Sequence, residues 1–289
     1  MQPILQDAVQ RRATDIVLIN NTVWFRIQGK LQSTNHSATS FESVPNGFEK
    51  KSETHIRCLP TDLTLSGLQY PGEVSKVLDF EKGLVILSGA HNSGKTTLLL
   101  HWLNSLKDRS VDSEITLPPN MTPHVLWSID QPDIRIVRIT DATSALQALR
   151  DSIHHLVIAV LDARTNADAL RHIRMLLSQY NTQTIQSLMS EQICSVVNIA
   201  LVRTVQQQYR PLVSITNRNE SISAQIAEGE FHKLEDSVQR GNGGLGSLSC
   251  DVQLAEWLQQ RQIQLDEGLR FANYPATMRL RASGIIHND

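Results

Sequence analysis

The sequence predicts an α/β protein: a wound, largely parallel sheet with helices, preceded by a small N-terminal α+β domain. Short apolar runs alternate with helical stretches over most of the chain after residue 69, and this alternation is typical of α/β domains. The run LVILSG is typical of a parallel strand buried on both faces. A Gly-rich turn and the helical stretch TTLLLHWLNSL follow it directly, so the sequence predicts a β-loop-α unit here.

Composition narrows the class of protein further. The 289 residues are 40% hydrophobic and 19% charged, which is ordinary for a globular protein with one large or two modest domains. A formal net charge of -2, an aromatic content of 5% and the lack of a nucleic-acid motif give no reason to expect nucleic acid as a partner. Three scattered cysteines, Cys58, Cys194 and Cys250, fit neither a zinc site nor a disulfide scaffold, so we expect a reducing cytoplasm.

The sequence contains no signal for membrane insertion. The first residues lack a basic region followed by an apolar one, and no window approaches 18 uninterrupted apolar residues. Any association with a membrane is therefore expected to be peripheral.

The N-terminal part contains a predicted hairpin. Residues 14–31 place two β-rich runs around the turn-forming pair Asn20-Asn21. Residues 32–51 are rich in polar residues and glycine with little periodicity, so we expect a flexible insert there. Residues 61–83 are expected to form a connector with one short helix, and the predicted domain boundary near residue 68 gives domains 1–68 and 69–289.

The remaining elements follow in order. Further predicted strands are HVLWSI, IRIVRI, HLVIAVL and PLVSIT, and predicted helices are ATSALQALRDSI, DALRHIRMLLSQY and TIQSLMSEQICSVVNIALVRTV. From about Glu220 the chain is expected to be mostly helical, with a break at the glycine cluster of residues 241–246. That cluster lacks a lysine and a preceding strand, so we expect a connector rather than a second phosphate loop.

Residues 89–97 fit the phosphate-binding pattern G-x-x-x-x-G-K-[ST] without a mismatch. The predicted nucleotide-binding residues are Gly89, Ala90, His91, Asn92, Ser93, Gly94, Lys95, Thr96 and Thr97. Glycines let the backbone N–H groups face phosphate oxygens, and the following helix directs its positive end at the same oxygens. Lys95 is expected to reach the β and γ phosphates, and Thr96 to ligate Mg²⁺. A chance Gly-rich turn is disfavoured because a buried-type strand and an apolar helix flank the motif.

Read outward from this loop, the sequence resembles the type II and type IV secretion ATPase superfamily, and is most similar to PilT-type pilus retraction ATPases. ATDIVL looks like the family's A-S-D-L-H-L, VWFRIQGKL like its R-I-D-G-x-L strand, and LSGLQYP like its linker. HHLVIAVLDARTNADALRHI looks like G-H-L-V-x-x-T-L-H-T-x-x-A, and SLMSEQICSVVNIALVRTV like the helix that follows it. SVQRGNGGLGSLSCDVQLAEWLQQRQI resembles the C-terminal I-Q-x-G-x-x-x-G-M-Q-T-L-D stretch. Their order and spacing carry the resemblance.

The resemblance implies a RecA-like P-loop NTPase domain after a small PAS-like domain. It also implies ATP and Mg²⁺ as cofactors, and a cytoplasmic hexameric ring that couples ATP hydrolysis to moving pilins or secretion components. Partners would then be further copies of the chain, a paralogous ATPase, and platform proteins of the pilus or secretion system at the inner membrane.

The sequence departs from the family pattern where the catalytic carboxylate is expected. In one alignment SIDQP, with Asp130, stands for the family's Asp box and the Walker B strand is missing. In the other, QPDIRIVRITDA is the Walker B strand, and Arg138 and Ile139 stand where Gly and Glu belong. Neither side chain can orient water and accept its proton. Asp130, Asp133 and Asp141 are the possible substitutes, and both alignments remain open.

The family's histidine box is half retained. His155 matches its first histidine, and Asp162 occupies the place of the second, where it adds negative charge beside a polyanionic ligand unless a metal, Arg164 or Arg171 offsets it. His155 is equally consistent with a capping or surface role beside His154. The candidate catalytic residues are thus Lys95, Asp130 and His155.

Two functions from different classes follow from these residues. The first is an ATP-hydrolysing motor subunit of a type IV pilus or secretion system. The second is an ATP-binding but hydrolysis-impaired structural or regulatory subunit that partners an active paralogue. An unrelated P-loop kinase or GTPase is disfavoured because N-K-x-D and a recognisable lid or acceptor motif are absent from the sequence.

Overall fold

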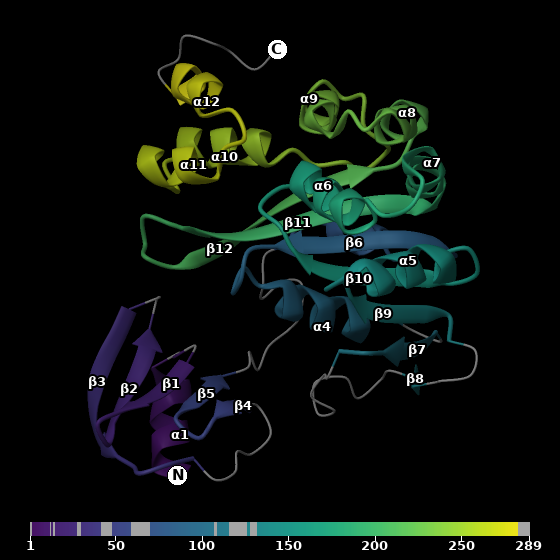
Figure 1. Ribbon diagram of the computed structural model, residues 1–289. Coiled ribbons are helices and arrows are strands. Elements are labelled where there is room, and N and C mark those ends of the chain that lie inside the picture. The colour runs from purple at the N-terminus through teal and green to yellow at the C-terminus, as the bar shows by residue number, and fades with distance from the viewer. Residues whose placement is uncertain are drawn as a thin grey trace. The chain divides into compact units, whose positions relative to one another are not determined.

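The computed structural model describes residues 2–11, 13, 15–27, 30–41, 48–58, 70–106, 109–115, 126–127 and 132–282. The chain divides into two compact units, residues 1–63 with 117–123 and residues 64–116 with 124–289. The predicted boundary near residue 68 lies outside the described residues and stays a prediction. Figure 1 labels the elements of both units where there is room.

The first unit contains one helix and an antiparallel sheet. Its elements are α1 (Gln2–Gln10), β1 (Asp15–Ile19), β2 (Thr22–Ile27), β3 (Lys30–Ser37), β4 (Phe48–Ser52) and β5 (His55–Cys58). The five strands lie in the order β3-β2-β1-β5-β4, with antiparallel neighbours throughout. Ile4, Leu5 and Ala8 of α1 share a buried cluster with alternate residues of β1 and β2, so helix and sheet form one small core.

The predicted hairpin is confirmed. Ile19 of β1 pairs with Thr22 of β2, and Asn20 and Asn21 between them have φ of 49° and 60°. Two positive φ values are typical of the turn that matches the twist of a hairpin.

The predicted loop over residues 32–51 is wrong in two places, because residues 30–37 form β3 against β2 and residues 48–52 form β4 against β5. Both strands lie at the edges of the five-stranded sheet, where backbone pairing with one neighbour can form a strand from a polar sequence. The rest of the predicted insert includes residues 42–47, which lie outside the described part of the chain.

The second unit has a seven-stranded sheet in the order β12-β11-β6-β10-β9-β7-β8. All neighbours are parallel except β11 and β12, which form an antiparallel pair, so the α/β class is confirmed. The strands are β6 (Gly83–Gly89), β7 (Ser110–Ser113), β8 (Leu126–Trp127), β9 (Ile134–Arg138), β10 (Leu156–Asp162), β11 (Ile193–Arg203) and β12 (Tyr209–Asn217).

The helices of this unit are α3 (Glu73–Lys76), α4 (Lys95–Ser105), α5 (Ala142–Asp151), α6 (Asn166–Leu176), α7 (Thr182–Gln192), α8 (Glu220–Glu228), the short 3₁₀ helix η2 (Phe231–Lys233), α9 (Leu234–Gln239), α10 (Cys250–Gln259), α11 (Leu265–Phe271) and α12 (Pro275–Ala282). Helices α5 to α9 share one buried cluster with alternate residues of β6, β9 and β10. Helices α10 to α12 pack against the β11–β12 pair in a second cluster, as Figure 1 shows in yellow beside green.

One predicted helix is partly wrong. The stretch from Thr184 to Val205 begins as α7, but residues 193–203 form β11, a strand between β6 and β12. The run ICSVVNIALV is apolar and rich in β-branched residues, which favour strands once neighbours are available on both sides.

Among the helices that the structure describes, none has the length and apolar character that a membrane span requires.

Candidate functional site

The phosphate-loop residues lie between β6 and α4, at the edge of the sheet where the parallel strands end. Gly89 is the last residue of β6, and Asp162, the last residue of β10, pairs with it in register. In open α/β sheets, ligands bind at this carboxyl edge. The predicted loop is therefore placed where its motif has chemical meaning.

Two glycines allow the loop its shape. Gly94 precedes α4 with φ of 100° and ψ of 9°, a left-handed conformation that side chains disfavour. A Cβ at Gly89 would lie 2.3 Å from Ser93 Oγ and 2.4 Å from the carbonyl oxygen of Ile199. Residue 89 must therefore lack a side chain for β6, the loop and β11 to approach one another.

Lys95 folds back over the loop. Its Nζ donates to the carbonyl oxygens of Gly89 at 2.8 Å and Ala90 at 2.7 Å, and pairs with Asp162 Oδ1 at 2.7 Å. The Lys95 side chain is buried, with 10% exposed. The ammonium of Lys95 is thus held at the mouth of the loop.

Several features of the loop fit a bound phosphate. Ser93 Oγ is buried and, within the described residues, has no hydrogen-bond partner, so it can donate to a phosphate oxygen. Ala90, His91 and Asn92 are exposed. Thr96 lies in the first turn of α4 and is half-buried, in the position from which a hydroxyl can reach a phosphate-bound metal.

A buried polar network supports the strand ends beside the loop. Asn198 of β11 donates through Nδ2 to Ser88 Oγ at 2.9 Å and to the carbonyl oxygen of Ala163 at 3.2 Å. Ser88 Oγ donates in turn to the carbonyl oxygen of Val197 at 3.2 Å. Asn198 was not among the predicted site residues; the signal for it is a single polar residue inside the apolar run VVNIAL.

Asp162 is the ion-pair partner of Lys95. The hydrogen bond from Lys95 lowers the pKa of Asp162 most, although partial burial opposes it, and the charges of Lys95, His91 and Arg138 lower it further. Asp162 is therefore ionised at neutral pH. The sequence placed Asp162 in the histidine box but did not predict that it pairs with Lys95.

His155 lies at the opposite edge of the sheet. It directly precedes β10, its carbonyl oxygen accepts from the N–H of Gly83 at 3.1 Å, and its Nδ1 lies 2.8 Å from the carbonyl oxygen of Pro132. Gly83 begins the strand that Gly89 ends, so His155 is about 20 Å from the loop at 3.3 Å per residue. The structure corrects the predicted placement: His155 is not part of the phosphate site of its own chain.

The three carboxylates considered as substitutes for the catalytic glutamate lie in different places. Asp130 lies outside the described residues and stays a prediction. Asp133 directly precedes β9, at the edge of the sheet away from the loop. Its carboxylate accepts hydrogen bonds from the N–H of Ser110 at 2.7 Å and from Ser110 Oγ at 2.9 Å. Asp141 lies at the loop edge, but its carboxylate caps α5 through the N–H of Ser144 at 2.8 Å.

The strand β9 agrees with the second of the two alignments. It is parallel to β10, with Arg138 opposite Val160, and the N–H of Ile139 donates to the carbonyl oxygen of Val160 at 3.0 Å. The end of β9 therefore lies at the carboxyl edge, where the Walker B residues are expected. Arg138 is exposed and Ile139 is buried, so the two residues there are a cation and an apolar side chain.

The two arginines that were considered as partners of Asp162 are placed elsewhere. Arg171 forms an ion pair with Asp168 one turn away on α6. Arg164 is exposed and lines a cavity of about 40 Å³ with Asn166 and Asn198. Neither forms the contact with Asp162 that Lys95 forms.

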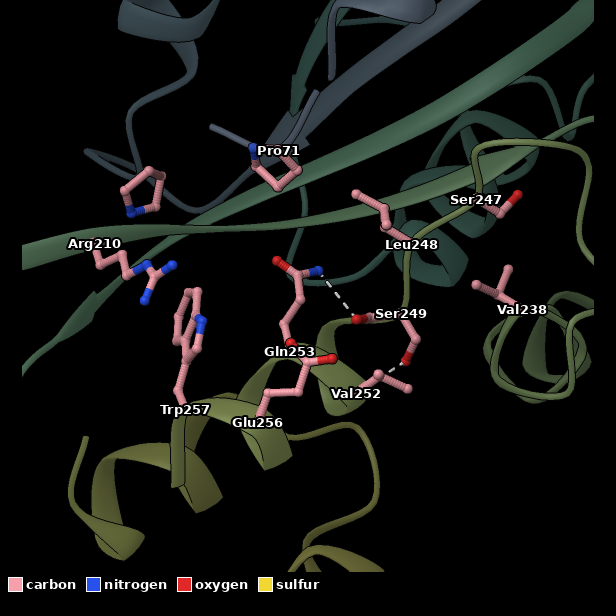
Figure 2. Close-up of a pocket in the computed structure, with 11 residues that line it drawn as sticks. Pro71, Arg210, Val238, Ser247, Leu248, Ser249, Val252, Gln253, Glu256 and Trp257 are labelled. Carbon is pink, nitrogen blue, oxygen red and sulfur yellow. Dashed lines mark hydrogen bonds between the residues drawn. The ribbon is translucent and has the colours of Figure 1, made fainter. Parts of the chain in front are cut away.

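A larger cavity of about 400 Å³ lies between β12 and α10 and contains no residue of the phosphate loop. Figure 2 shows the guanidinium of Arg210 beside the indole of Trp257, and the Arg210 Cζ lies 4.3 Å from the ring centroid. Gln253 Nε2 donates to the carbonyl oxygens of Val213 at 2.6 Å and Ser249 at 3.1 Å. These contacts tie α10 to β12, so Arg210 and Gln253 serve packing here.

Glu235, Cys250 and Asp251 also lie close together, with ligand atoms within 4.8 Å of one another. Their polar atoms are already engaged. Asp251 accepts from the N–H groups of Asn273 at 2.8 Å and Tyr274 at 2.9 Å, and Ser249 Oγ donates to Glu235 at 2.6 Å. The cluster is satisfied by hydrogen bonds from the protein.

No family model matches the sequence, and no curated protein does. The fold, in contrast, is similar to those of several solved structures. The ATPase DotB of Legionella pneumophila has a TM-score of 0.73 at 16% identity over 93% of this chain and 94% of that one. The pilus retraction motor PilT with bound ADP has a TM-score of 0.72 at 15% identity over 94% of this chain and 97% of that one.

A second DotB, from Yersinia pseudotuberculosis, gives a TM-score of 0.73 at 12% identity over 96% of this chain and 93% of that one. The chain therefore has the RecA-like α/β fold of these ATPases, as predicted. Identities this low show the shared fold, and the function is argued from the site.

Proposed function

We propose that this chain is an ATP-binding subunit of the type II/type IV secretion ATPase superfamily, of the PilT type, in which ATP hydrolysis drives type IV pilus dynamics or protein secretion. The observation that carries the proposal is the phosphate loop at the carboxyl edge of the sheet, with Lys95 buried at its mouth. The similarity of the fold to DotB and PilT supports it.

Each residue of the loop has a role in this proposal. The N–H groups of residues 90–95 and the N-terminus of α4 bind the phosphates, and Ser93 Oγ supplies a further donor. Lys95 exchanges its contact with Asp162 for the β and γ phosphates. Thr96 is the side chain that would hold Mg²⁺, which when bound neutralises charge on the phosphates.

The proposal also implies an oligomeric state, a location and a set of partners. We expect a cytoplasmic hexamer that contacts pilus or secretion platform proteins at the inner membrane. A ring also gives each site a neighbour that can contribute groups to it, which matters because β9 ends at Arg138 and is followed by Ile139, neither of which is a carboxylate.

Nucleotide binding is tested by isothermal titration calorimetry with MgATP and MgADP. Lys95→Ala should weaken binding about 100-fold, because it removes a charge-assisted contact from a desolvated site. Lys233→Ala is the matched control, since Lys233 is half exposed and pairs with Glu230 on the surface. Equal affinities of the wild type and Lys95→Ala would contradict the proposed site.

A second candidate function is an ATP-binding subunit impaired in hydrolysis that partners an active paralogue. The observation that favours it is the pair Arg138 and Ile139 at the end of β9, where neither residue can activate water. Phosphate release from MgATP separates the two functions. Tight binding without release above the Lys95→Ala background supports the second, and robust turnover by the isolated chain contradicts it.

A further inference from the structure

The contact between Lys95 and Asp162 has a consequence for nucleotide binding. An ammonium has three N–H donors, and Lys95 Nζ has three acceptors: the carbonyl oxygens of Gly89 and Ala90 and the Asp162 carboxylate. Its donor capacity is therefore filled. A phosphate can contact Lys95 only by replacing one of these acceptors.

Asp162 is the acceptor that gives way most readily. The two carbonyl groups belong to the loop backbone, whose shape is fixed by the close approach of Gly89 to Ile199. Asp162, in contrast, is a side chain at the end of β10 with 62% of its surface exposed, so it can rotate into solvent. Its exchange for a phosphate needs no change in the backbone.

Asp162 also occupies a position suited to an anion. Lys95, His91 and Arg138 all lie close enough to hold its pKa below the ordinary value. Lys95 and Arg138 are cationic side chains, and a cation paired with a carboxylate at the end of the phosphate loop can equally pair with a phosphate oxygen. An ionised carboxylate in such a place repels a phosphate that approaches the same cations.

We propose that Asp162 sets the nucleotide preference of this site: it competes with the terminal phosphates for Lys95 Nζ, and it thereby lowers the affinity for ATP more than the affinity for ADP. This inference rests on the proposed function, because it presupposes that the loop binds nucleotide. The difference between the two nucleotides arises because the γ phosphate adds charge and needs the same ammonium. AMP lacks both terminal phosphates and is expected to be insensitive to Asp162.

The test is calorimetric titration of the wild type and Asp162→Asn with ATP, ADP and AMP in EDTA. The asparagine keeps the shape of the side chain and removes its charge. ATP should bind roughly five- to ten-fold more tightly to the variant, because a repulsive charge at contact distance is removed from a partly exposed site. ADP should gain less, and AMP nothing.

Asp236→Asn is the matched control, since Asp236 is 47% exposed and pairs with Arg240 on α9. It removes the same charge without touching the loop and should leave all three affinities unchanged. An Asp162→Asn variant that binds ATP no better than the wild type, or that gains equally for all three nucleotides, would overturn the inference. Weaker ATP binding would also overturn it, by showing that the carboxylate helps to hold the nucleotide.

A second measurement tests the ion pair without nucleotide. Acetylation of Lys95 by a small reagent, followed by mass spectrometry, should be a few-fold faster in Asp162→Asn because Nζ is less engaged, while Lys233 reacts equally in both proteins. An unchanged rate at Lys95 would overturn the inference. Faster acetylation without nucleotide binding by either protein would instead overturn the proposed function, and the nucleotide preference with it, while the ion pair would stand.

Discussion

Gly89 gives the most direct test of the loop at the scale of one residue. We expect Gly89→Ala to lower the free energy of unfolding by about 1–3 kcal/mol and to abolish nucleotide binding. The added Cβ would lie 2.3 Å from Ser93 Oγ and 2.4 Å from the carbonyl oxygen of Ile199. The carbonyl belongs to β11 and cannot move without disturbing the sheet. Urea unfolding and calorimetry with MgATP measure the two effects.

Gly72→Ala is the control for this substitution. A Cβ at Gly72 meets nothing within 4 Å, and its φ of -61° is open to any residue. The variant should unfold within about 0.5 kcal/mol of the wild type and bind nucleotide normally. A Gly89→Ala protein as stable as Gly72→Ala would show that the loop has a different shape in solution.

Glu235 gives a pH-dependent prediction at the same scale. Burial raises its pKa above the usual value of 4.5, and the charge of nearby Asp251 adds to this, although Ser249 opposes it through a hydrogen bond. The folded state therefore binds the Glu235 proton more tightly than the unfolded chain. This contribution to stability is fully present below pH 4.5 and is lost as the pH rises through the folded pKa.

Glu235→Gln should remove that loss, because a neutral amide in the same place carries no charge to bury. The variant should be more stable than the wild type at pH 8, and the difference should vanish at pH 4, as measured by urea unfolding at both values. Glu228→Gln, at an exposed position, is the control. A Glu235→Gln variant that is equally or less stable at pH 8 would contradict this account.

The site residues differ in how far the sequence could predict them. The phosphate loop could be predicted because its chemistry lies within nine consecutive residues. The contact of Asp162 with Lys95 could not, because it depends on the register that pairs Asp162 with Gly89 across two strands. The same register excludes His155, which matches a motif in sequence but directly precedes the strand that Asp162 ends.

At the scale of elements, the packing of α10 on β12 depends on Arg210 and Trp257. The guanidinium lies 4.3 Å from the indole centroid, and Trp257 is 5% exposed in a cluster with Leu212 and Leu254. Trp257→Ala should cost about 3–5 kcal/mol of unfolding free energy. Arg210→Ala should cost about 1–2 kcal/mol, through the lost cation–π contact and the hydrogen bond to Gln262.

These values are measured by urea unfolding, with Arg240→Ala as the control. Arg240 has 71% of its side chain exposed and pairs with Asp236 on the surface, so its loss should cost less than about 1 kcal/mol. A double variant of Arg210 and Trp257 should be less destabilised than the sum of the single ones, since they contact each other. Strict additivity would contradict the stacking.

The errors in predicting elements have physical causes. An apolar run such as residues 193–203 carries no polar alternation, so periodicity cannot separate a buried strand from a buried helix. It becomes β11 because β6 and β12 pair with it on both sides. β3 is the opposite case, since polar residues such as Gln32 and Ser33 hide a strand whose backbone pairs with β2. Both outcomes depend on partners distant in sequence.

At the scale of the whole molecule, the order of elements is largely predictable from the sequence, and the residues that would activate water are not. Strands that alternate with helices predict a parallel sheet wherever they occur, and a phosphate loop fixes which edge of that sheet binds ligand. The residues at the end of β9 raise a separate point. The proposed phosphate-binding residues lie within one chain, but Arg138 and Ile139 at the end of its β9 offer no carboxylate with which to activate water.

The lack of a carboxylate at the end of β9 gives a prediction for the assembly of several copies of the chain. If a neighbouring copy completes the site, ATP turnover per subunit should rise steeply with protein concentration, in parallel with a species of six-fold subunit mass measured by mass photometry. Lys95→Ala should assemble, because Lys95 is buried inside its own chain, and yet show no turnover. A turnover per subunit that stays constant over a 100-fold range of concentration would show that one chain suffices. No turnover at any concentration, with ATP bound, would favour the hydrolysis-impaired subunit, and activity should then appear only after an active paralogue is added.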